Sequence, residues 1–247
     1  MDKLLALPVR RIARFDIEKN QQELRDIASR IKEIKHQNYS RSGMEYCLQK
    51  MIESSRQAGT LISFSETHDN DRLADSGKTF ARFRLLACAL LSTEGAFGFA
   101  NGAEFYAKEK IDVHKDCALN FGAGEHLCAL TGTLNELLNV HPAFIGNSQL
   151  RSVSTRGGET MAFLRSDAEN QNKVLILLNP DCSHSQQVHF PGELPDEGID
   201  LLSGKQIIFH REGAELTFDL PPGSGFAVSF EKSVWLRVSM SSRKNVL

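Results

Sequence analysis

Residues 59–72 read Gly-Thr-Leu-Ile-Ser-Phe-Ser-Glu-Thr-His-Asp-Asn-Asp-Arg. A short apolar, β-prone run, Leu61 to Phe64, ends abruptly in polar and charged residues. This pattern is typical of a buried strand that delivers reactive groups at its carboxyl end, as strands of parallel sheets and barrels do. The titratable residues gathered at this tip are Glu66, His68, Asp69, Asp71 and Arg72. We therefore expect the functional site of the chain to lie here.

The residues around this stretch alternate between helical and strand patterns. Apolar residues recur at helical spacing over 18–36, 44–56, 78–92 and 125–139, which predicts four helices. A second short apolar run, residues 95–99, predicts another strand, with Asn101, Gly102 and Glu104 at its end. Helices and strands in alternation indicate an α/β architecture.

The hydrophobic period changes after about residue 154. Short β-like runs follow, separated by Gly, Pro, Asn and Asp, at residues 161–165, 173–179, 187–190, 206–210, 215–220 and 225–230. These runs predict a compact antiparallel, all-β domain after the α/β part. The predicted fold class is therefore α/β plus all-β.

Composition excludes several classes of partner. The chain has 247 residues, 41% hydrophobic and 24% charged, with a formal net charge of −2, so it is not built to bind nucleic acid or an anionic membrane. No apolar run is long enough to span a bilayer, and the Leu-Leu-Ala-Leu run near the amino terminus is too short for a secretory segment. The odd number of cysteines, five, fits free thiols in a reducing compartment, so we expect a cytoplasmic protein.

Three further motifs are better explained without a cofactor. Ser76-Gly-Lys-Thr79 resembles the end of a phosphate-binding loop but lacks the required glycine, because Arg72 stands in its place. The alternating residues Asp112, His114 and Asp116 fit a solvated loop better than a metal site. Cys182, His184 and His189 do not complete a four-ligand zinc site. We therefore expect neither a metal nor another cofactor.

An ordered series of features resembles the C-terminal part of an α-amylase-type (glycoside hydrolase family 13) enzyme. His68-Asp69-Asn70, at a strand end and followed by Arg72, resembles the fourth signature region of that family. Residues 86–104 are similar to the helix, the eighth barrel strand and the Gly-x-Glu turn. Residues 127–144 are similar to the last barrel helix, and the β-rich remainder to the small sandwich after the barrel. The resemblance covers residues 59–230.

The resemblance implies a fold and a role for each site residue. Residues 1–150 would form the C-terminal portion of a (β/α)8 barrel, residues 151–232 an antiparallel β-sandwich, and residues 233–247 an unassigned tail. The family retains configuration while acting on α-glucosidic bonds, by hydrolysis or transglycosylation. Asp69 would be the transition-state stabiliser that accepts two sugar hydroxyls. His68, Arg72 and Glu104 would bind the α-glucan or oligosaccharide substrate.

Two departures from the family limit these expectations. Thr67 stands where the signature usually has the asparagine that ligates chloride, so chloride dependence is not expected. The family nucleophile and acid/base lie upstream of this strand, and the residues before His68 cannot hold strands one to five at about 30 residues per βα unit. We therefore expect an incomplete piece that is inactive alone, with the missing N-terminal barrel half as partner. The alternative is a non-catalytic module that binds carbohydrate or a partner chain through its β domain.

Overall fold

The computed structural model describes residues 40–59, 61–92, 96–115, 118–146, 148–156 and 158–231. The predicted helix over 18–36 and the tail 233–247 lie outside the described residues. The chain divides into two compact units, with the boundary between Leu61 and Ile62. The predicted site residues, from Glu66 to Arg72 and Glu104, and all later elements belong to the second unit, so the site can be built from that unit alone.

The described part of the first unit is one helix, α3 (Arg41–Ala58). The Ser40 hydroxyl caps its start by accepting a hydrogen bond from the Gly43 amide at 3.1 Å, which satisfies a donor that the first helical turn leaves unpaired. The helix ends at Gly59, whose φ of 106° is open to glycine and strained for other residues. The helix predicted over 44–56 is confirmed and begins earlier, because the capping serine precedes the first apolar residue.

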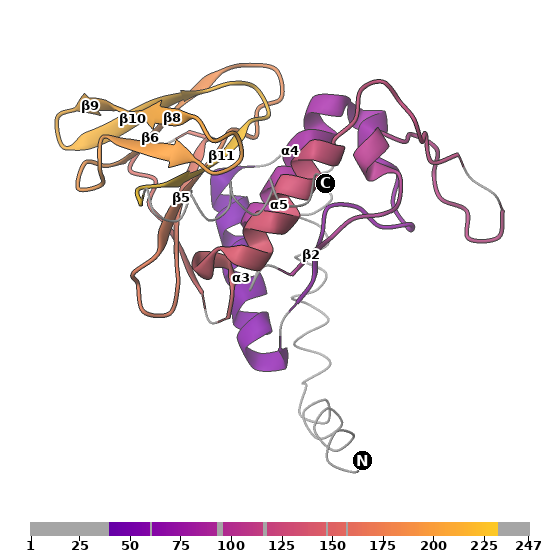
Figure 1. The fold of residues 1–247 in the computed structure, drawn as a ribbon, viewed down its shortest axis with the longest axis horizontal. Helices are drawn as coiled ribbons and strands as arrows, with labels where there is room; N and C mark the ends of the chain where they lie inside the picture. The colour runs from indigo at the N-terminus through magenta and orange to yellow at the C-terminus, as the bar shows by residue number, and fades with distance from the viewer. Residues whose placement is uncertain are drawn as a thin grey trace, which may run out of the picture. The chain divides into compact units, whose positions relative to one another are not determined.

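The second unit opens with short strands and helices in alternation (Figure 1). They are β1 (Ser63–Phe64), η1 (Leu73–Ser76), α4 (Lys78–Leu90), β2 (Phe97–Gly98), η3 (Ala103–Phe105), α5 (Cys128–Val140) and η4 (Pro142–Phe144). Strands β1 and β2 pair in parallel, with Ser63 opposite Phe97. The carboxyl ends of both strands therefore point the same way, and the segments that follow them emerge at one edge.

The prediction that the first strand is buried is wrong. Ile62 and Phe64 are 59% and 49% exposed. Within the described ranges β1 pairs with β2 and with no third strand, so nothing covers the outer side of this parallel pair. The Phe64 ring lies instead against Gly98, where a Cβ atom would come within 2.7 Å of the ring. Ser63 and Phe64 of the predicted run 61–64 form a strand, and among the described residues β2 is its one partner.

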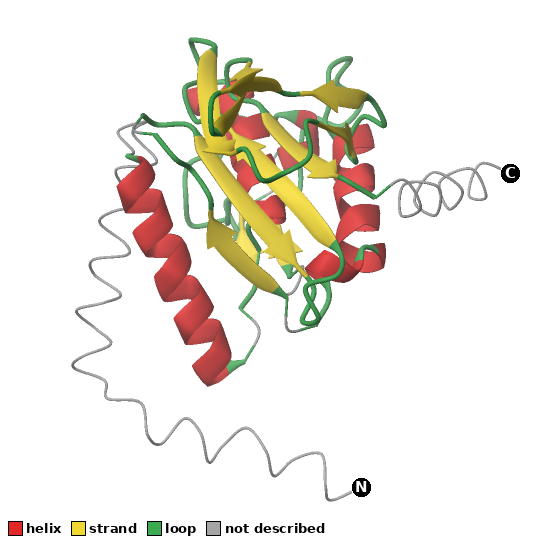
Figure 2. Ribbon diagram, turned by 90° about the vertical axis from the view of Figure 1, so that its left-hand side faces the viewer, coloured by secondary structure: helices red, strands yellow, loops and turns green. Residues whose placement is uncertain are grey.

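Helix α4 is buried, as its almost continuous apolar sequence predicts. Phe80, Phe83, Leu86 and Leu90 are at most 1% exposed. The helix contacts α5 and strand β11 (Gly225–Ser229), so it lies between the helical part and the β-rich part. Figure 2 distinguishes the helices, in red, from the strands, in yellow. No helix in the described ranges is both long and apolar enough to cross a membrane.

The β-rich part consists of two antiparallel sheets. Its strands are β3 (Gln149–Ser152), β4 (Met161–Ser166), β5 (Lys173–Leu178), β6 (Gln186–Pro191), β7 (Glu197–Asp200), β8 (Gln206–Ile208), β9 (His210–Glu212), β10 (Glu215–Leu220) and β11. The larger sheet has the order β3-β4-β5-β11-β7-β8, and the smaller one β6-β10-β9. Figure 1 shows β6, β8, β9, β10 and β11 in the orange and yellow part of the chain.

Alternate residues of both sheets meet in one apolar core. This core takes Ala162 and Leu164 from the larger sheet, and Val188, Phe190, Leu216 and Leu220 from the smaller one. One shared core between two antiparallel sheets confirms the predicted antiparallel β part. Strands β3 and β7 escaped prediction because polar residues dominate their sequences, and the run 206–210 is divided at Phe209 between two sheets.

A buried arginine joins the helical part to the β-rich part. Arg165 is 1% exposed and lies on β4. Its guanidinium donates to the carbonyls of Ala143 (2.7 Å) and Leu90 (3.0 Å) and to the Ser148 hydroxyl (3.0 Å), and it lies 4.4 Å from the centre of the Phe144 ring. Burial lowers the pKa of Arg165, yet a guanidinium stays charged at neutral pH. The charge is thus balanced by carbonyl dipoles and an aromatic face.

A buried histidine lies near this arginine. His141 is 1% exposed, and its Nδ1 accepts a hydrogen bond from the Ala143 amide at 3.2 Å. Burial lowers the pKa of His141 to about 4; Asp167 opposes this effect and Arg165 adds to it. The neutral ring is therefore the folded form at neutral pH.

We expect the free energy of unfolding to fall between pH 6.5 and about 4, because the unfolded histidine binds a proton there and the folded one does not. The loss should reach at most about 3 kcal/mol. In His141→Asn, an amide oxygen can still accept from Ala143, and nothing titrates. Urea denaturation at several pH values should show a shallower decline for this variant across that window, and equal slopes in both proteins would contradict the assignment.

Candidate functional site

The segment after β1 is closed by a buried ion pair. Glu66 and Arg72 are 5% and 1% exposed, and Arg72 Nη2 lies 2.9 Å from Glu66 Oε1. The other carboxylate oxygen of Glu66 accepts the Leu73 amide at 2.8 Å, and Arg72 Nη2 also donates to the Asn101 carbonyl at 2.9 Å. These bonds hold together the two ends of the loop 67–71 and tie the loop to the segment after β2.

The charge state of Glu66 is set by opposing effects. Burial raises the pKa of Glu66, whereas the Leu73 amide and the Arg72 guanidinium lower it, and the nearby Glu104 raises it further. The net direction is upward, because the loss of hydration outweighs the favourable contacts. The pair is therefore costly to bury and also costly to break, which is the usual property of a buried ion pair.

The loop between these anchors presents His68 and Asp69 to solvent. Their side chains are 57% and 80% exposed, and His68 Nε2 lies 3.2 Å from Asp69 Oδ1. Asn70 shapes the turn beneath them, because its amide side chain donates to the Thr67 hydroxyl at 2.8 Å and its backbone amide to the Thr67 carbonyl at 3.3 Å. The arrangement places an acceptor and a donor side by side, which can bind neighbouring hydroxyl groups.

Glu104 follows β2 along the chain, and its carboxylate points inward. It belongs to η3, and its Oε2 atom is buried without a hydrogen-bonding partner among the described residues. Gly102 precedes it with φ of 88°, and a Cβ atom there would lie 3.1 Å from Arg72 Nη2 and 2.9 Å from the Leu119 carbonyl. Only glycine fits this close approach of the two strand ends.

Several buried polar atoms around the ion pair lack partners. Within the part of the chain that the structure describes, these are Ser65 Oγ, Arg72 Nε, Arg72 Nη1 and Glu104 Oε2. A cavity of about 10 Å³ beside Ser65 and Glu66 has room for about one water molecule. Buried donors and acceptors are normally satisfied, so this cluster needs water or further protein groups.

The structure thus brings the four predicted site residues to one edge but gives them different surroundings. His68 and Asp69 are accessible, whereas Arg72 is buried against Glu66 and Glu104 faces the same interior. The sequence interpretation overlooked the Glu66–Arg72 pair itself. Its signal was the presence of opposite charges at both ends of a short polar loop that follows an apolar strand.

Other clusters with titratable groups have simple local partners. Asp112 accepts the His114 amide at 3.0 Å and lies 3.5 Å from Lys115 Nζ, as expected of a solvated loop, while Asp116 lies outside the described residues. His184 pairs with Asp181 at 3.2 Å. Over the described ranges, no group of three His, Cys, Asp or Glu side chains is arranged to hold a metal ion.

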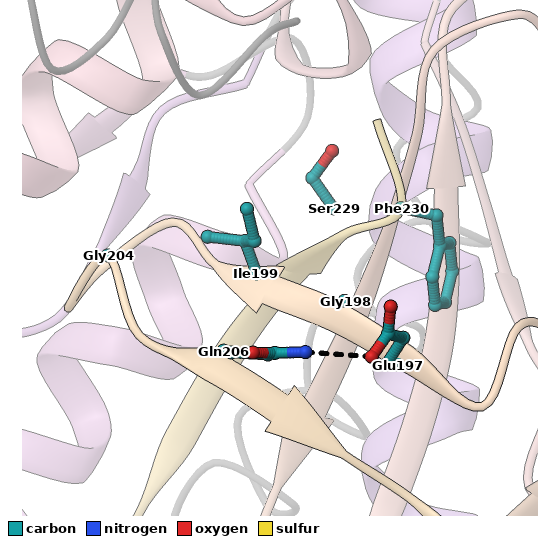
Figure 3. Close-up of a pocket in the computed structure, with 7 residues that line it drawn as sticks. All are labelled: Glu197, Gly198, Ile199, Gly204, Gln206, Ser229 and Phe230. Carbon is teal, nitrogen blue, oxygen red and sulfur yellow. Dashed lines mark hydrogen bonds between the residues drawn. The ribbon is translucent and has the colours of Figure 1, made fainter. Parts of the chain in front are cut away.

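The β-rich part contains a separate cavity of about 220 Å³ (Figure 3). Glu197, Gly198 and Ile199 of β7 line it together with Gly204, Gln206, Ser229 and Phe230. Gln206 Nε2 donates to Glu197 Oε2 at 2.7 Å, and a Cβ atom at Gly198 would lie 3.3 Å from the Phe230 ring. This lining combines an aromatic ring with an amide–carboxylate pair, which suits a polar ligand with an apolar face.

Comparisons with known proteins identify the fold. No protein-family model and no curated protein sequence matches the chain. Among solved structures, a maltogenic α-amylase, AmyB, from Thermotoga neapolitana matches with a TM-score of 0.64 and 15% identity, over 83% of this chain and 49% of that one. An α-amylase from Anoxybacillus matches with a TM-score of 0.61 and 17% identity, over 77% and 42%. An α-amylase from H. orenii matches with a TM-score of 0.60 and 14% identity, over 84% and 48%.

The chain therefore spans about half the length of the α-amylase structures that it matches. This share is consistent with the predicted C-terminal piece of such an enzyme. At these identities the likeness concerns the fold.

Proposed function

We propose that this chain forms part of the substrate site of a retaining enzyme that acts on α-glucosidic bonds. In this proposal Asp69 stabilises the transition state, and His68 donates a hydrogen bond to the same sugar. Strands β1 and β2 would be the last two strands of a (β/α)8 barrel. Nucleophile and acid/base would come from the other part of that barrel, whose strands would also cover Ile62 and Phe64.

One observation carries the proposal: an exposed His68–Asp69 pair is held at the carboxyl end of a parallel strand by a buried ion pair. Active sites of barrel enzymes lie at this end of the strands. A carboxylate that accepts two hydroxyls strengthens those bonds as positive charge develops on the sugar ring, so it acts on the transition state.

The buried position of Arg72 changes the role that we propose for it. Because Arg72 is 1% exposed and bound to Glu66, we assign it to holding the loop in place. Glu104, whose carboxylate faces the same interior, would likewise help to hold the loop in place. Hydrolysis and transglycosylation both remain within the proposal, since the two reactions share these residues.

We expect the purified 247-residue chain to show no turnover of starch, maltodextrins or nitrophenyl α-glucosides. Retaining chemistry requires a nucleophile and an acid/base, and the sequence before His68 has no motif that resembles the family strands that carry these two carboxylates. A reducing-sugar assay and release of nitrophenol are the measurements. Robust turnover that disappears in Asp69→Asn would mean that this chain contains all the machinery.

Binding of maltotriose tests the substrate assignment directly. In an NMR titration of the chain, we expect the backbone resonances of His68, Asp69 and Asn70 to shift, with a Kd of about 1 mM or weaker. The Asp69→Ala variant should lose these shifts while keeping its fold. Shifts absent from this loop at saturating sugar would count against the proposal.

A non-catalytic carbohydrate-binding module is the second candidate function, and the cavity lined by Glu197, Gln206 and Phe230 favours it. Its aromatic ring and amide–carboxylate pair are groups that bind sugars. The same titration separates the two functions, because this alternative requires shifts at Gln206 and Phe230 that disappear in Phe230→Ala and persist in Asp69→Ala.

A further inference from the structure

An exposed aromatic side chain stands on the loop between η3 and α5. Phe121 is 64% exposed. Its ring centre lies 5.2 Å from that of Phe105, edge to face at 88°, and Phe105 in turn lies 6.2 Å from His126. Edge-to-face packing supports the Phe121 ring from one side and leaves much of its surface open.

The backbone on both sides of Phe121 is fixed in an unusual conformation. Asn120 has φ of 56° and Gly122 has φ of 79°, both in the left-handed region. The Asn120 side chain donates to the Phe105 carbonyl at 2.6 Å, which anchors the turn to the residue that packs under Phe121. A non-glycine residue in this region costs free energy, so the surrounding contacts determine the position of the exposed ring.

This ring lies on the loop that leaves the same strand edge as His68 and Asp69. The loop returns to this edge at Gly102. A Cβ atom at Gly102 would lie 2.9 Å from the Leu119 carbonyl oxygen and 3.1 Å from Arg72 Nη2, so both groups approach this glycine closely. The Leu127 amide donates to the Glu104 carbonyl at 2.6 Å, and Lys78 pairs with Glu125 at 2.5 Å. Figure 1 shows the segment after β2 extending to the right of the strands. Phe121 packs on Phe105, the Phe105 amide donates to the Gly102 carbonyl at 3.0 Å, and Gly102 lies beside Arg72 of the candidate site.

We propose that Phe121 is a stacking platform for a glucosyl residue of an α-glucan, apart from the residue bound by Asp69 and His68. The inference rests on the proposed function and adds a second point of contact. The C–H groups of a pyranose form an apolar face that packs on an aromatic ring, while its hydroxyls stay in water. A phenylalanine makes no hydrogen bond of its own, so it suits a glucan position that is held by stacking alone.

The proposal predicts that sugar binding depends on the aromatic ring rather than on apolar area. Maltoheptaose is the probe, and NMR titration of the 247-residue chain is the measurement. In the unaltered chain, Phe121 ring resonances should shift and sugar C–H resonances should move upfield. Phe121→Ala should weaken binding about 3- to 10-fold and abolish the upfield shift. Phe121→Leu should weaken it similarly, and Phe121→Trp should restore or tighten it.

Val113 offers a matched control, since it is 66% exposed in the same segment and has no aromatic ring. Val113→Ala should leave binding unchanged. Asp69→Ala should remove the shifts at His68 and keep the upfield shift of the sugar C–H resonances caused by Phe121. The experiment therefore tests the stacking platform independently of the proposed role of Asp69. Full binding by Phe121→Leu, an equal effect of Val113→Ala, or maltoheptaose that never perturbs Phe121 would each overturn the stacking platform, whatever happens at Asp69.

Discussion

Replacing Arg72 with methionine is expected to lower the free energy of unfolding by about 3–5 kcal/mol. The substitution leaves the carboxylate of Glu66 buried at 5% exposure without its cationic partner. Burial already raises the pKa of Glu66, and loss of the guanidinium should raise it further. The deficit should therefore shrink as the pH falls and Glu66 becomes neutral. Chemical denaturation at neutral and at acidic pH measures both effects.

The double variant Glu66→Gln with Arg72→Met is the control for this prediction. It removes both charges and keeps an amide oxygen that can accept the Leu73 amide, so it should recover at least about half of the stability lost by Arg72→Met. A double variant as unstable as the single one would show that the volume of Arg72, rather than the orphaned carboxylate, sets the cost.

The second large effect is expected for Asp69→Asn in an enzyme that combines this chain with strands carrying a nucleophile and an acid/base. The rate constant kcat should fall at least about 100-fold, with a smaller change in KM. The amide keeps the size of the side chain but loses the charge and half of the bidentate acceptance. Steady-state kinetics on a maltooligosaccharide provide the measurement.

Two controls accompany this substitution. His68→Asn should reduce kcat less, because the carboxylate remains. Because the Asp69 side chain is 80% exposed, Asp69→Asn should change the free energy of unfolding by no more than about 0.5 kcal/mol. A near-normal kcat for Asp69→Asn would mean that the exposed pair has no part in the chemistry.

Hydrophobic periodicity predicted the elements that bury a continuous apolar face. Helix α4 and strands β4, β5, β10 and β11 fall where the sequence places them, because their burial leaves a strong local signal. Strand β7 was missed because Glu197, Gly198 and Asp200 carry no alternating apolar pattern. It is a strand because it pairs with β8, which follows it, and with β11, which lies further along the chain. Local sequence cannot report such pairings.

The sequence predicted the accessible residues of the candidate site, His68 and Asp69. It did not predict the buried Glu66–Arg72 ion pair that supports their loop. His68 and Asp69 are conspicuous because two titratable groups follow an apolar run. The environment of Arg72 could not be predicted, since burial depends on Asn101 and Gly102, which are far along the chain and are brought close by the pairing of β1 with β2. The exposure of Ile62 and Phe64 likewise depends on which strands lie beside β1. The apolar run itself does not encode those neighbours.

The three hydrogen bonds of Arg165 have a consequence for protein engineering. The β-rich part cannot be transplanted as a cassette, because its Arg165 would arrive without the carbonyls of Leu90 and Ala143 that solvate its charge. A recombination point placed near residue 150 would put Arg165 in one parent sequence and the carbonyls of Leu90 and Ala143 in the other. Chimeras should instead be joined upstream of α4, so that the helix end, the Phe144 ring and the arginine are inherited together.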